Sequence, residues 1–423
     1  MKVFKFGGAS VKNADALKNV ASILSLFEGE KLTVVVSAMG KTTNKLEEIV
    51  YALKKRDRKE FLGLIEELEL FHEDILADLF PEKHFSIYNT IETIFEQLKE
   101  KINKPFSENT SFEYDQIVSL GEVISSHIVA AFLTEQSFSA QWIDARQLVR
   151  TDNNYQEGKV DWSKTEFLIQ SKFLPEFSNS NILVTQGFLG HTPEGFTTTL
   201  GREGSDYTAG IFAFCGNAES VSIWKDVPGM LNADPKYFEE TIKLDKISFK
   251  EAIELSYYGA TVIHPKTIKP LQNKGIPLFV KSFVEPLSEG TVIQSSTSND
   301  DLVPSFIFKV EQTLYSFTPK DFSFIVEENL SDIFNQLSLA KAKINLMQNS
   351  ALSFSILVDS EKTSPETILN LFSTNYEVRY NEGLELVTIR HYDVATIDRV
   401  TKDKEIILQQ RTRHTARFIL KNI

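Results

Sequence analysis

KVFKFGGAS at residues 2–10 is the stretch that decides the fold, because a short apolar run leads directly into two glycines and a hydroxyl residue. A second strand-like run, Leu32–Val36, ends in the same way in small residues. Between them, Ala14–Leu26 places its apolar residues on one helical face. Strand, helix and strand in this order predict a parallel strand pair, and therefore an α/β sheet.

Outward from this unit, the periodicity of apolar residues changes twice. Residues 46–98 carry apolar stripes at helical spacing, which predicts a helical lobe over the sheet. Strand-like runs return at 182–186, 221–224 and 278–281. We therefore expect the sheet to resume there and to end near Ile293.

The length of 423 residues exceeds the ~250–300 at which one hydrophobic core stops growing, so at least two domains are expected. A Ser, Thr, Asn and Asp-rich stretch at 294–301 has the composition of a linker. We predict an α/β domain at 1–293, a linker at 294–303 and a small α+β domain at 304–423. The expected elements of that last domain are strands at 314–317, 322–326, 354–358 and 384–390, a helix at 330–341, and a basic, solvated surface over the final 25 residues.

Charge and cysteine content limit the classes of partner. A formal charge of −13 argues against nucleic acid and against an anionic membrane surface as partners. We expect no membrane span and no signal peptide. Because Cys215 is the only cysteine, no internal disulfide can form, which fits the reducing cytoplasm.

The first candidate for chemistry is Lys5 with the turn that follows it. A strand-end ammonium and the bare backbone N–H groups of Gly7 and Gly8 can approach phosphate, and Ser10 adds a hydroxyl group. The Gly-x4-Gly-Lys motif of Walker loops is absent. The alternative is a tight strand-to-helix turn with an exposed lysine.

Two further segments could bind an amino acid, which needs opposite charges for its two ionic groups. Arg202 and Asp206 lie four residues apart in a glycine-bearing turn, and Glu122 follows Ser119-Leu120-Gly121. The alternatives are a local Arg–Asp ion pair, worth little in water, and a plain acid at a helix start.

A loop at 224–236 follows a strand and projects several charges. Lys225 and Lys236 could lie near nucleotide phosphates, although Pro-Gly and Asp-Pro also punctuate purely structural turns. His264 has no metal-ligand partner at helical spacing, so we interpret it as structural.

Taken together, these segments resemble the aspartate kinases of the amino-acid kinase fold. The matching motifs are KFGGAS at 5–10, VVSAMGKTTN at 35–44, SLGE at 119–122, TLGREGSD at 199–206, DVPGMLNADP at 226–235 and GATVIHP at 259–265. The resemblance covers residues 2 to about 293, and the rest of the chain looks like the family's regulatory ACT region. It implies a mainly parallel sheet flanked by helices, followed by a small α+β domain.

The resemblance also implies roles for individual residues. ATP with Mg²⁺ and L-aspartate would be the substrates, with no protein metal site, and Lys5 and Asp206 would be catalytic. ATP would be bound by Lys5, Gly7, Gly8, Ser10, Ser37, Lys225, Asp226, Leu231 and Lys236. Aspartate would be bound by Thr43, Glu122, Arg202 and Asp206.

This inventory is consistent with phosphoryl transfer to a carboxylate. With a pKa of ~3.9, the aspartate β-carboxylate is already an anion at neutral pH and needs no general base. The obstacle is the repulsion between two anions, which calls for cations and positioning. Lys5 and a nucleotide-borne Mg²⁺ would supply those cations.

The sequence departs from the family pattern at several positions. Ala9 replaces a threonine, Glu203 a glycine and Lys236 an arginine, while Thr261 stands where many relatives carry lysine. One hypothesis is that Lys225 supplies the ammonium group that is lost at position 261. Another amino-acid kinase, such as one acting on glutamate, and a non-catalytic ACT-type sensor are the alternative functions. Without Gly-x-Gly-x-x-Gly after the linker, no fused homoserine dehydrogenase is expected.

The C-terminal region departs most from lysine-sensitive relatives. Two positions where an acid would hold a lysine ligand are Asn345 and Ala351, and Glu327 and Glu328 stand before the helix. We expect weak or absent inhibition by lysine, with Glu327 or Glu328 restoring the site as the alternative. We expect the residues after Arg390 to be too few and too basic for a complete second ACT unit. We also expect the C-terminal domain to serve mainly as the interface of a homodimer.

Overall fold

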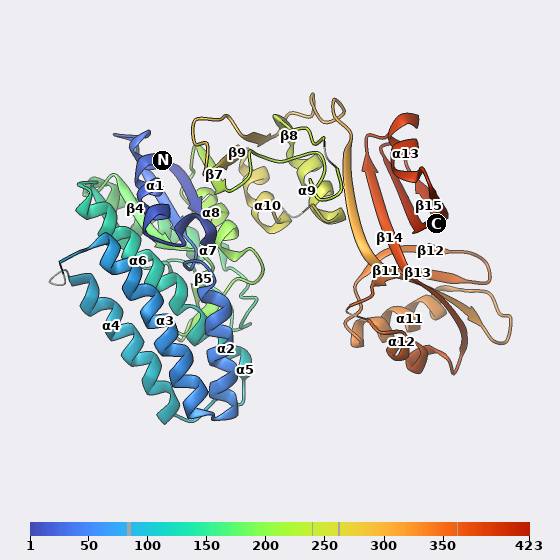
Figure 1. The fold of residues 1–423 in the computed structure, drawn as a ribbon, viewed down its shortest axis with the longest axis horizontal. Helices are drawn as coiled ribbons and strands as arrows, with labels where there is room; N and C mark the ends of the chain where they lie inside the picture. Colours follow the sequence, from blue (N-terminus) through green and yellow to red (C-terminus); the bar gives the residue numbers. More distant parts are fainter. Residues whose placement is uncertain (83–85, 239, 261–262, 362) are drawn as a thin grey trace. The chain divides into compact units, whose positions relative to one another are not determined.

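The structure is a computed structural model that describes residues 1–82, 86–238, 240–260, 263–361 and 363–423. The chain forms two compact units (Figure 1). The N-terminal unit comprises 1–230, 243–253 and 261–298, and the C-terminal unit comprises 231–242, 254–260 and 299–423. The domain limits predicted from the sequence, at 1–293, 294–303 and 304–423, remain predictions.

The N-terminal unit is built on an eight-stranded sheet of order β3-β4-β2-β1-β7-β9-β10-β8. Apart from the antiparallel pair of β9 and β10, its neighbouring strands are parallel. The predicted strands at 2–6, 32–36, 182–186, 221–224 and 278–281 are confirmed. The strands are β1 (Lys2–Phe6), β2 (Leu32–Val36), β3 (Ala140–Ile143), β4 (Ile182–Gln186), β7 (Ser220–Lys225), β8 (Lys246–Ser248), β9 (Leu278–Ser282) and β10 (Thr291–Gln294).

Helices flank this sheet, and the helical lobe predicted for residues 46–98 is present as α2 to α4 (Figure 1). The small hairpin of β5 (Leu189–His191) and β6 (Thr197–Thr199) lies outside the main sheet. The helices are α1 (Ala14–Ser25), α2 (Thr42–Lys55), α3 (Arg58–Leu79), α4 (Ser86–Lys99), α5 (Thr110–Val118), α6 (Leu120–Glu135), α7 (Trp162–Leu168), α8 (Gly204–Cys215), α9 (Phe249–Tyr258) and α10 (Pro265–Lys274).

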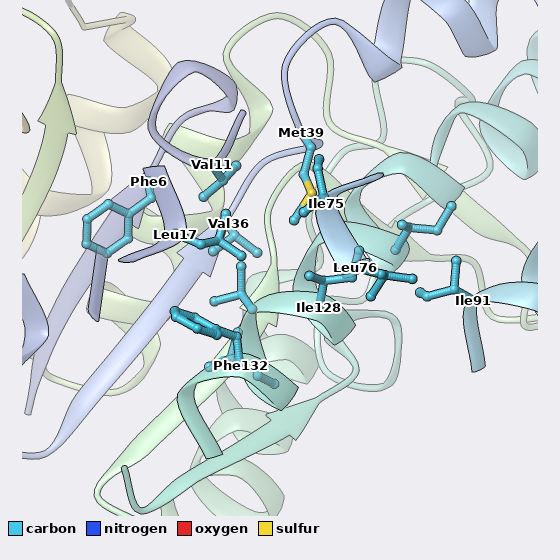
Figure 2. Close-up of a cluster of buried hydrophobic side chains, with 14 of the residues drawn as sticks. Phe6, Val11, Leu17, Val36, Met39, Ile75, Leu76, Ile91, Ile128 and Phe132 are labelled. Carbon is cyan, nitrogen blue, oxygen red and sulfur yellow. The ribbon is translucent and has the colours of Figure 1, made fainter. Parts of the chain in front are cut away.

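One continuous core joins the sheet to the helical lobe. Figure 2 shows Phe6 and Val36 of the central strands in the same buried cluster as Ile75 of α3 and Ile128 of α6. Burial of such side chains stabilises the fold by ~1.5–3 kcal/mol each. The turns that follow β1 and β2 are therefore attached to a closely packed core.

One segment of the described residues has a composition that is compatible with a membrane span. Thr110–Glu135, which contains α5 and α6, is long and apolar enough to cross a membrane. However, 78% of its most apolar window is buried inside the structure. Its apolarity is explained by its place among other helices and strands of the core.

The C-terminal unit contains a six-stranded antiparallel sheet of order β12-β13-β11-β14-β16-β15. The order of β12, β13, β11 and β14, with α11 and α12 as connections, is that of a ferredoxin-like split βαβ unit. Its elements are β11 (Ser305–Pro319), α11 (Glu327–Leu339), β12 (Ile344–Asn349), β13 (Phe354–Asp359), α12 (Pro365–Phe372), β14 (Tyr376–Arg390), α13 (Val394–Thr401), β15 (Lys404–Arg411) and β16 (Thr415–Asn422).

Three expectations for this unit need correction. The segment 322–326 is not a strand but a loop that leads into α11. The final 25 residues are not a solvated tail, because they include β15 and β16, and Phe418 and Leu420 are buried. The region after Arg390 is also long enough to complete a second four-strand half, made of β11, β14, β16 and β15 with α13. Apolar residues alternate with the basic ones in β16, so the basic composition of this segment does not indicate a solvated tail.

The start of α8 is fixed against the end of β4 by an interlocking of glycines. A methyl group on Gly187 would lie 2.4 Å from Cβ of Ser205 and 2.8 Å from its Cα. A methyl group on Gly204 would lie 2.4 Å from the Phe188 ring. Larger residues at either glycine would therefore push α8 away from the sheet.

We predict that Gly187→Ala destabilises the protein by ~1–3 kcal/mol, because the added methyl group meets Cβ and the backbone Cα of Ser205 rather than the far end of a flexible side chain. Gly63→Ala is the matched control, since nothing lies within 4 Å of its added methyl group inside α3. That change should stabilise the protein by ~0.5–1 kcal/mol. Urea unfolding measures both, and equal stability of the two variants would contradict the interlocking.

Candidate active site

A cavity of about 580 Å³ opens beside the carboxyl ends of β1, β2 and β7. Strand β1 lies between β2 and β7, so the chain first continues to one side of β1 and later returns to its other side. Such a switch point at the carboxyl edge is where α/β sheets generally bind ligands. Lys5, Ser37 and Lys225 line the cavity from these three strand ends.

Asp206 links two of these strand ends through ion pairs. Its Oδ1 lies 2.6 Å from Lys5 Nζ and its Oδ2 lies 3.5 Å from Lys225 Nζ. Burial acts to raise the pKa of Asp206, but the two lysines outweigh this effect and hold it below the usual range. Lys5 is only 8% exposed, so the alternative of an exposed turn lysine is wrong. The alternative of a local Arg202–Asp206 pair is also wrong, since both oxygens face lysines.

The glycine turn after β1 brings backbone close to this charged group. A methyl group on Gly8 would lie 2.9 Å from the Ala38 carbonyl oxygen and 3.0 Å from that of Gly40. Only glycine therefore allows the segments after β1 and β2 to approach so closely. Gly8, Ser37 and Gly40 all line the cavity, as phosphate binding by backbone groups requires.

Glu122, on the first turn of α6, gives the cavity a second kind of acid. It is 3% exposed, and its Oε2 has no hydrogen-bond partner among the described residues. Burial raises the pKa of Glu122 to about 8, although hydrogen bonds and the nearby Lys5 oppose the rise. An unpaired buried carboxyl group of this kind is suited to receive a cationic ligand group.

The structure brings most of the predicted site residues together. Those that line the cavity are Lys5, Gly8, Ser37, Thr43, Glu122, Arg202, Asp206 and Lys225. Thr43 comes from the start of α2, and Arg202 from the turn before α8. Each of these segments is separated in sequence from the others, so their convergence depends on the fold.

Other predicted residues lie outside the lining. Ser10 is buried and its Oγ donates to the Trp224 carbonyl at 3.4 Å, while Asp226 is exposed. Gly7 is near the cavity only through Lys5, whose Nζ would lie 3.3 Å from a methyl group there. Leu231 and Lys236 belong to the C-terminal unit, and Thr261 lies outside the described residues.

Sequence reasoning missed several residues of the cavity wall. Tyr114 donates to Glu47 Oε1 at 2.6 Å, and burial raises its pKa. Gln156 and Phe188 also line the cavity. None of these residues belongs to a charged or glycine-rich motif, so nothing local distinguished them.

Three residues of the cavity wall have an unfavourable backbone conformation. Gln156, Phe188 and Glu203 line it with φ values of 68°, 70° and 53°, in the left-handed region that costs ~1–2 kcal/mol for a residue with a side chain. Glu203 adopts this conformation immediately before α8, where the family pattern has glycine. Strained residues of this kind cluster at functional sites.

His264 and Cys215 were also considered in the sequence analysis, and the contacts of both residues indicate a structural role. His264 caps α10, since its Nδ1 accepts a hydrogen bond from Lys266 N at 3.1 Å. Cys215 is buried, and burial raises the pKa of its thiol to about 12. A thiol with this pKa stays protonated and unreactive at neutral pH.

Comparison with known proteins agrees with this geometry. Residues 1–282 match the model of the amino acid kinase family. Lysine-sensitive aspartokinase 3 of Escherichia coli is 31% identical over 410 residues, which cover 95% of this chain and 89% of that protein. The bifunctional aspartokinase/homoserine dehydrogenase of Buchnera aphidicola is 30% identical over 399 residues. The matched residues make up 91% of this chain and 47% of that longer protein.

Solved structures show the same architecture. E. coli aspartokinase III in complex with aspartate and ADP superposes with a TM-score of 0.78 and 27% identity over 99% of this chain and 96% of that chain. Clostridium acetobutylicum aspartate kinase, at 23% identity, superposes with a TM-score of 0.81 over 100% of this chain and 96% of that chain, which supports the fold. The predicted fold class and the resemblance to aspartate kinases are confirmed. The chain therefore belongs to the amino acid kinase family, and within it to the group of the aspartokinases.

Proposed function

We propose that this protein transfers the γ-phosphoryl group of ATP to the β-carboxylate of L-aspartate, giving 4-phospho-L-aspartate. The observation that carries this proposal is a single cavity lined by two lysines and by a buried carboxyl group whose Oε2 has no hydrogen-bond partner among the described residues. The lysines suit a triphosphate, and the carboxyl group suits the ammonium of an amino acid. Aspartate and ADP are the ligands named for the E. coli structure.

The chemical step needs little from the protein besides charge and position. A β-carboxylate oxygen forms a bond to the γ-phosphorus while the bond from that phosphorus to the β–γ bridging oxygen breaks. The electron pair of the broken bond leaves with ADP, and no proton has to be removed from the carboxylate. Catalysis then consists of holding two anions in line and neutralising the transferred group.

Lys5 and Lys225 are the cations proposed for the phosphates. Asp206 lies between them and holds both ammonium groups, so we assign it a positioning role toward Lys5 as well as the predicted contact to aspartate. The described residues include no cluster of three or more His, Cys, Asp or Glu side chains that could hold a metal. Mg²⁺ would therefore be held mainly by the ATP phosphates, where it neutralises charge.

The remaining residues are assigned by pairing each ionic group of a substrate with a side chain of opposite charge. Arg202 would bind the aspartate α-carboxylate, Glu122 its ammonium group, and Thr43 would add a hydrogen bond. Gly8 and Ser37 would contact phosphate through backbone and hydroxyl groups. Gly7, Ser10, Asp226, Leu231 and Lys236 remain proposed nucleotide residues on the strength of the motifs alone.

The family relationship places this reaction at the start of lysine, threonine and methionine biosynthesis. We propose a cytoplasmic location, which detection of the protein in a membrane or secreted fraction would contradict. A glutamate kinase and a non-catalytic sensor remain the alternative functions, and one assay separates all three. In that assay ATP turnover is measured with aspartate, with glutamate and with no amino acid.

We predict aspartate-dependent ADP release by the unaltered protein and a loss of about 10²–10³ in kcat for Lys5→Met, because charge on the transferred group loses its nearest cation. Lys5 is buried against Asp206, so some loss of stability is also expected. Lys2→Met is the matched control on the same strand, where Lys2 pairs with Glu30 at the opposite end. Near-normal kcat in Lys5→Met would remove Lys5 from the mechanism.

The raised pKa of Glu122 gives a second prediction. With a pKa of about 8, Glu122 is mostly protonated at neutral pH, whereas an ammonium ligand favours the carboxylate. Aspartate binding should therefore release most of one proton at pH 7 and less at pH 8.5, and should strengthen as pH rises from 6 to 8.

Calorimetry of aspartate binding in buffers of different ionisation enthalpy measures this release. Glu122→Gln should bind aspartate more weakly and release no proton from this site. An unchanged proton count in that variant would show that Glu122 does not receive the ammonium group.

Regulation and assembly are proposed from the C-terminal unit. Asn345 is 9% exposed, and its side chain already accepts from Lys309 Nζ at 2.8 Å and donates to Gln312 and Asp359 at 2.8 Å and 2.7 Å. It is therefore poorly placed to hold an added lysine.

Phe322 and Phe324 are 80% and 66% exposed in this unit. Their exposure supports a homodimer interface here. Sedimentation of the purified protein would test this assembly.

We predict that lysine binds weakly or not at all. An ammonium group without a carboxylate partner loses a charge-assisted bond of ~1.5–3 kcal/mol, or roughly ten- to a hundredfold in affinity. Calorimetry of lysine into the purified protein measures this directly. Micromolar binding that disappears in Glu327→Ala or Glu328→Ala would instead establish the alternative site at the start of α11.

A further inference from the structure

We propose that Asp115, a residue outside every motif discussed above, is a positioning residue that joins two segments of the cavity wall and so orients Arg202. This inference rests on the proposed function, because Arg202 is the proposed ligand of the aspartate α-carboxylate. The two segments are the loop at Gln156 and the turn that follows Thr199.

Asp115 lies on α5, is fully buried, and accepts three hydrogen bonds. Its Oδ2 accepts from Gln156 N and from Thr199 N, both at 2.9 Å. Its Oδ1 accepts from Thr199 Oγ1 at 2.8 Å. One carboxylate therefore binds a loop 41 residues away and a strand end 84 residues away in sequence.

Both bound segments belong to the cavity wall. Gln156 and Thr199 line the cavity, and so do Gly201 and Arg202, which follow Thr199. Gly201 has φ +76°, and a methyl group on it would lie 3.2 Å from the Gln156 carbonyl oxygen. The turn and the loop are thus packed against each other, with Asp115 behind both of them.

The Asp115 contacts also hold a strained conformation in place. Gln156 has φ 68°, which is unfavourable for a residue with a side chain. Its backbone N–H is held by Asp115, and its Nε2 donates to Ser111 Oγ at 3.2 Å. Without the carboxylate, the loop has little reason to keep this conformation.

The effect of losing Asp115 should remain local. Strand β6 has a second attachment to α5, since Gln116 Nε2 donates to the Thr197 carbonyl oxygen at 2.8 Å and Gln116 Oε1 accepts from Thr197 N at 3.3 Å. The hairpin therefore stays in place while the turn beyond Thr199 is released. Lys5 and Lys225 lie on β1 and β7, which Asp115 does not contact through these hydrogen bonds.

An amide can replace the carboxylate in this arrangement. Burial raises the pKa of Asp115 to about 6, against the opposing effect of its three donors, so the group is ionised at neutral pH. In Asp115→Asn, the amide oxygen can accept from both backbone N–H groups, while the amide nitrogen donates to a rotated Thr199 hydroxyl group. If position rather than charge matters, this variant should behave like the unaltered protein.

The test compares Asp115→Ala, Asp115→Asn and Thr199→Val in steady-state kinetics. Asp115→Ala should raise the KM for aspartate by about tenfold or more with the KM for ATP within about twofold, and Thr199→Val should show a smaller rise of the same kind. Asp115→Asn should restore the KM for aspartate to nearly its original value. Asp57→Ala is the matched control, because Asp57 accepts one backbone N–H at the start of α3, away from the cavity.

Amide hydrogen exchange without substrate tests, independently of activity, whether Asp115 joins the two segments of the cavity wall. Exchange at 154–158 and 199–203 should accelerate in Asp115→Ala and not in Asp57→Ala. Equal rises in both KM values, an Asn variant as impaired as the Ala variant, or unchanged exchange would each overturn the proposal. Absence of aspartate-dependent turnover in the unaltered protein would instead overturn the proposed function, and the exchange result would still decide whether Asp115 holds the wall.

Discussion

The buried ion pairs of Asp206 with Lys5 and Lys225 are the interaction on which the rest of the site depends. Asp206 is on α8, and the two lysines are on β1 and β7, so one carboxylate fixes a helix start against two neighbouring strands. A buried carboxylate with a single partner would be costly, whereas two cations compensate for its desolvation. The close glycine contacts at Gly187 and Gly204 are what allow α8 to approach the sheet so closely.

Most of the N-terminal unit could be predicted from the sequence because its signals are local. Leu32–Val36 and Ile182–Gln186 are fully buried strands in which most residues are apolar or β-branched, and the two glycines after Lys5 mark a turn in the sequence. Tyr114 could not be predicted in this way, because it reaches the cavity through the packing of α5. In the apolar segment Thr110–Glu135, a buried position in the core accounts for a composition that would also suit a membrane span.

The C-terminal unit was less predictable, since its strands are partly exposed and interrupted by charges. In β16, buried Ala416 and Phe418 alternate with half-buried Arg417, a pattern that a count of basic residues hides. The extent of β11 and β14 also could not be read from short apolar runs. Both strands are 15 residues long, and only part of each carries a clear alternation.

These two long strands have a consequence for how the C-terminal unit can change during evolution. β11 and β14 pair along their length, with register shifts between Lys309 and Leu314, and each contributes to both four-strand halves of the sheet. Neither half can be lost, duplicated or exchanged without cutting a strand that the other half also uses. The halves must therefore be inherited together, and a change in the register of one half is transmitted mechanically to the other through a shared backbone.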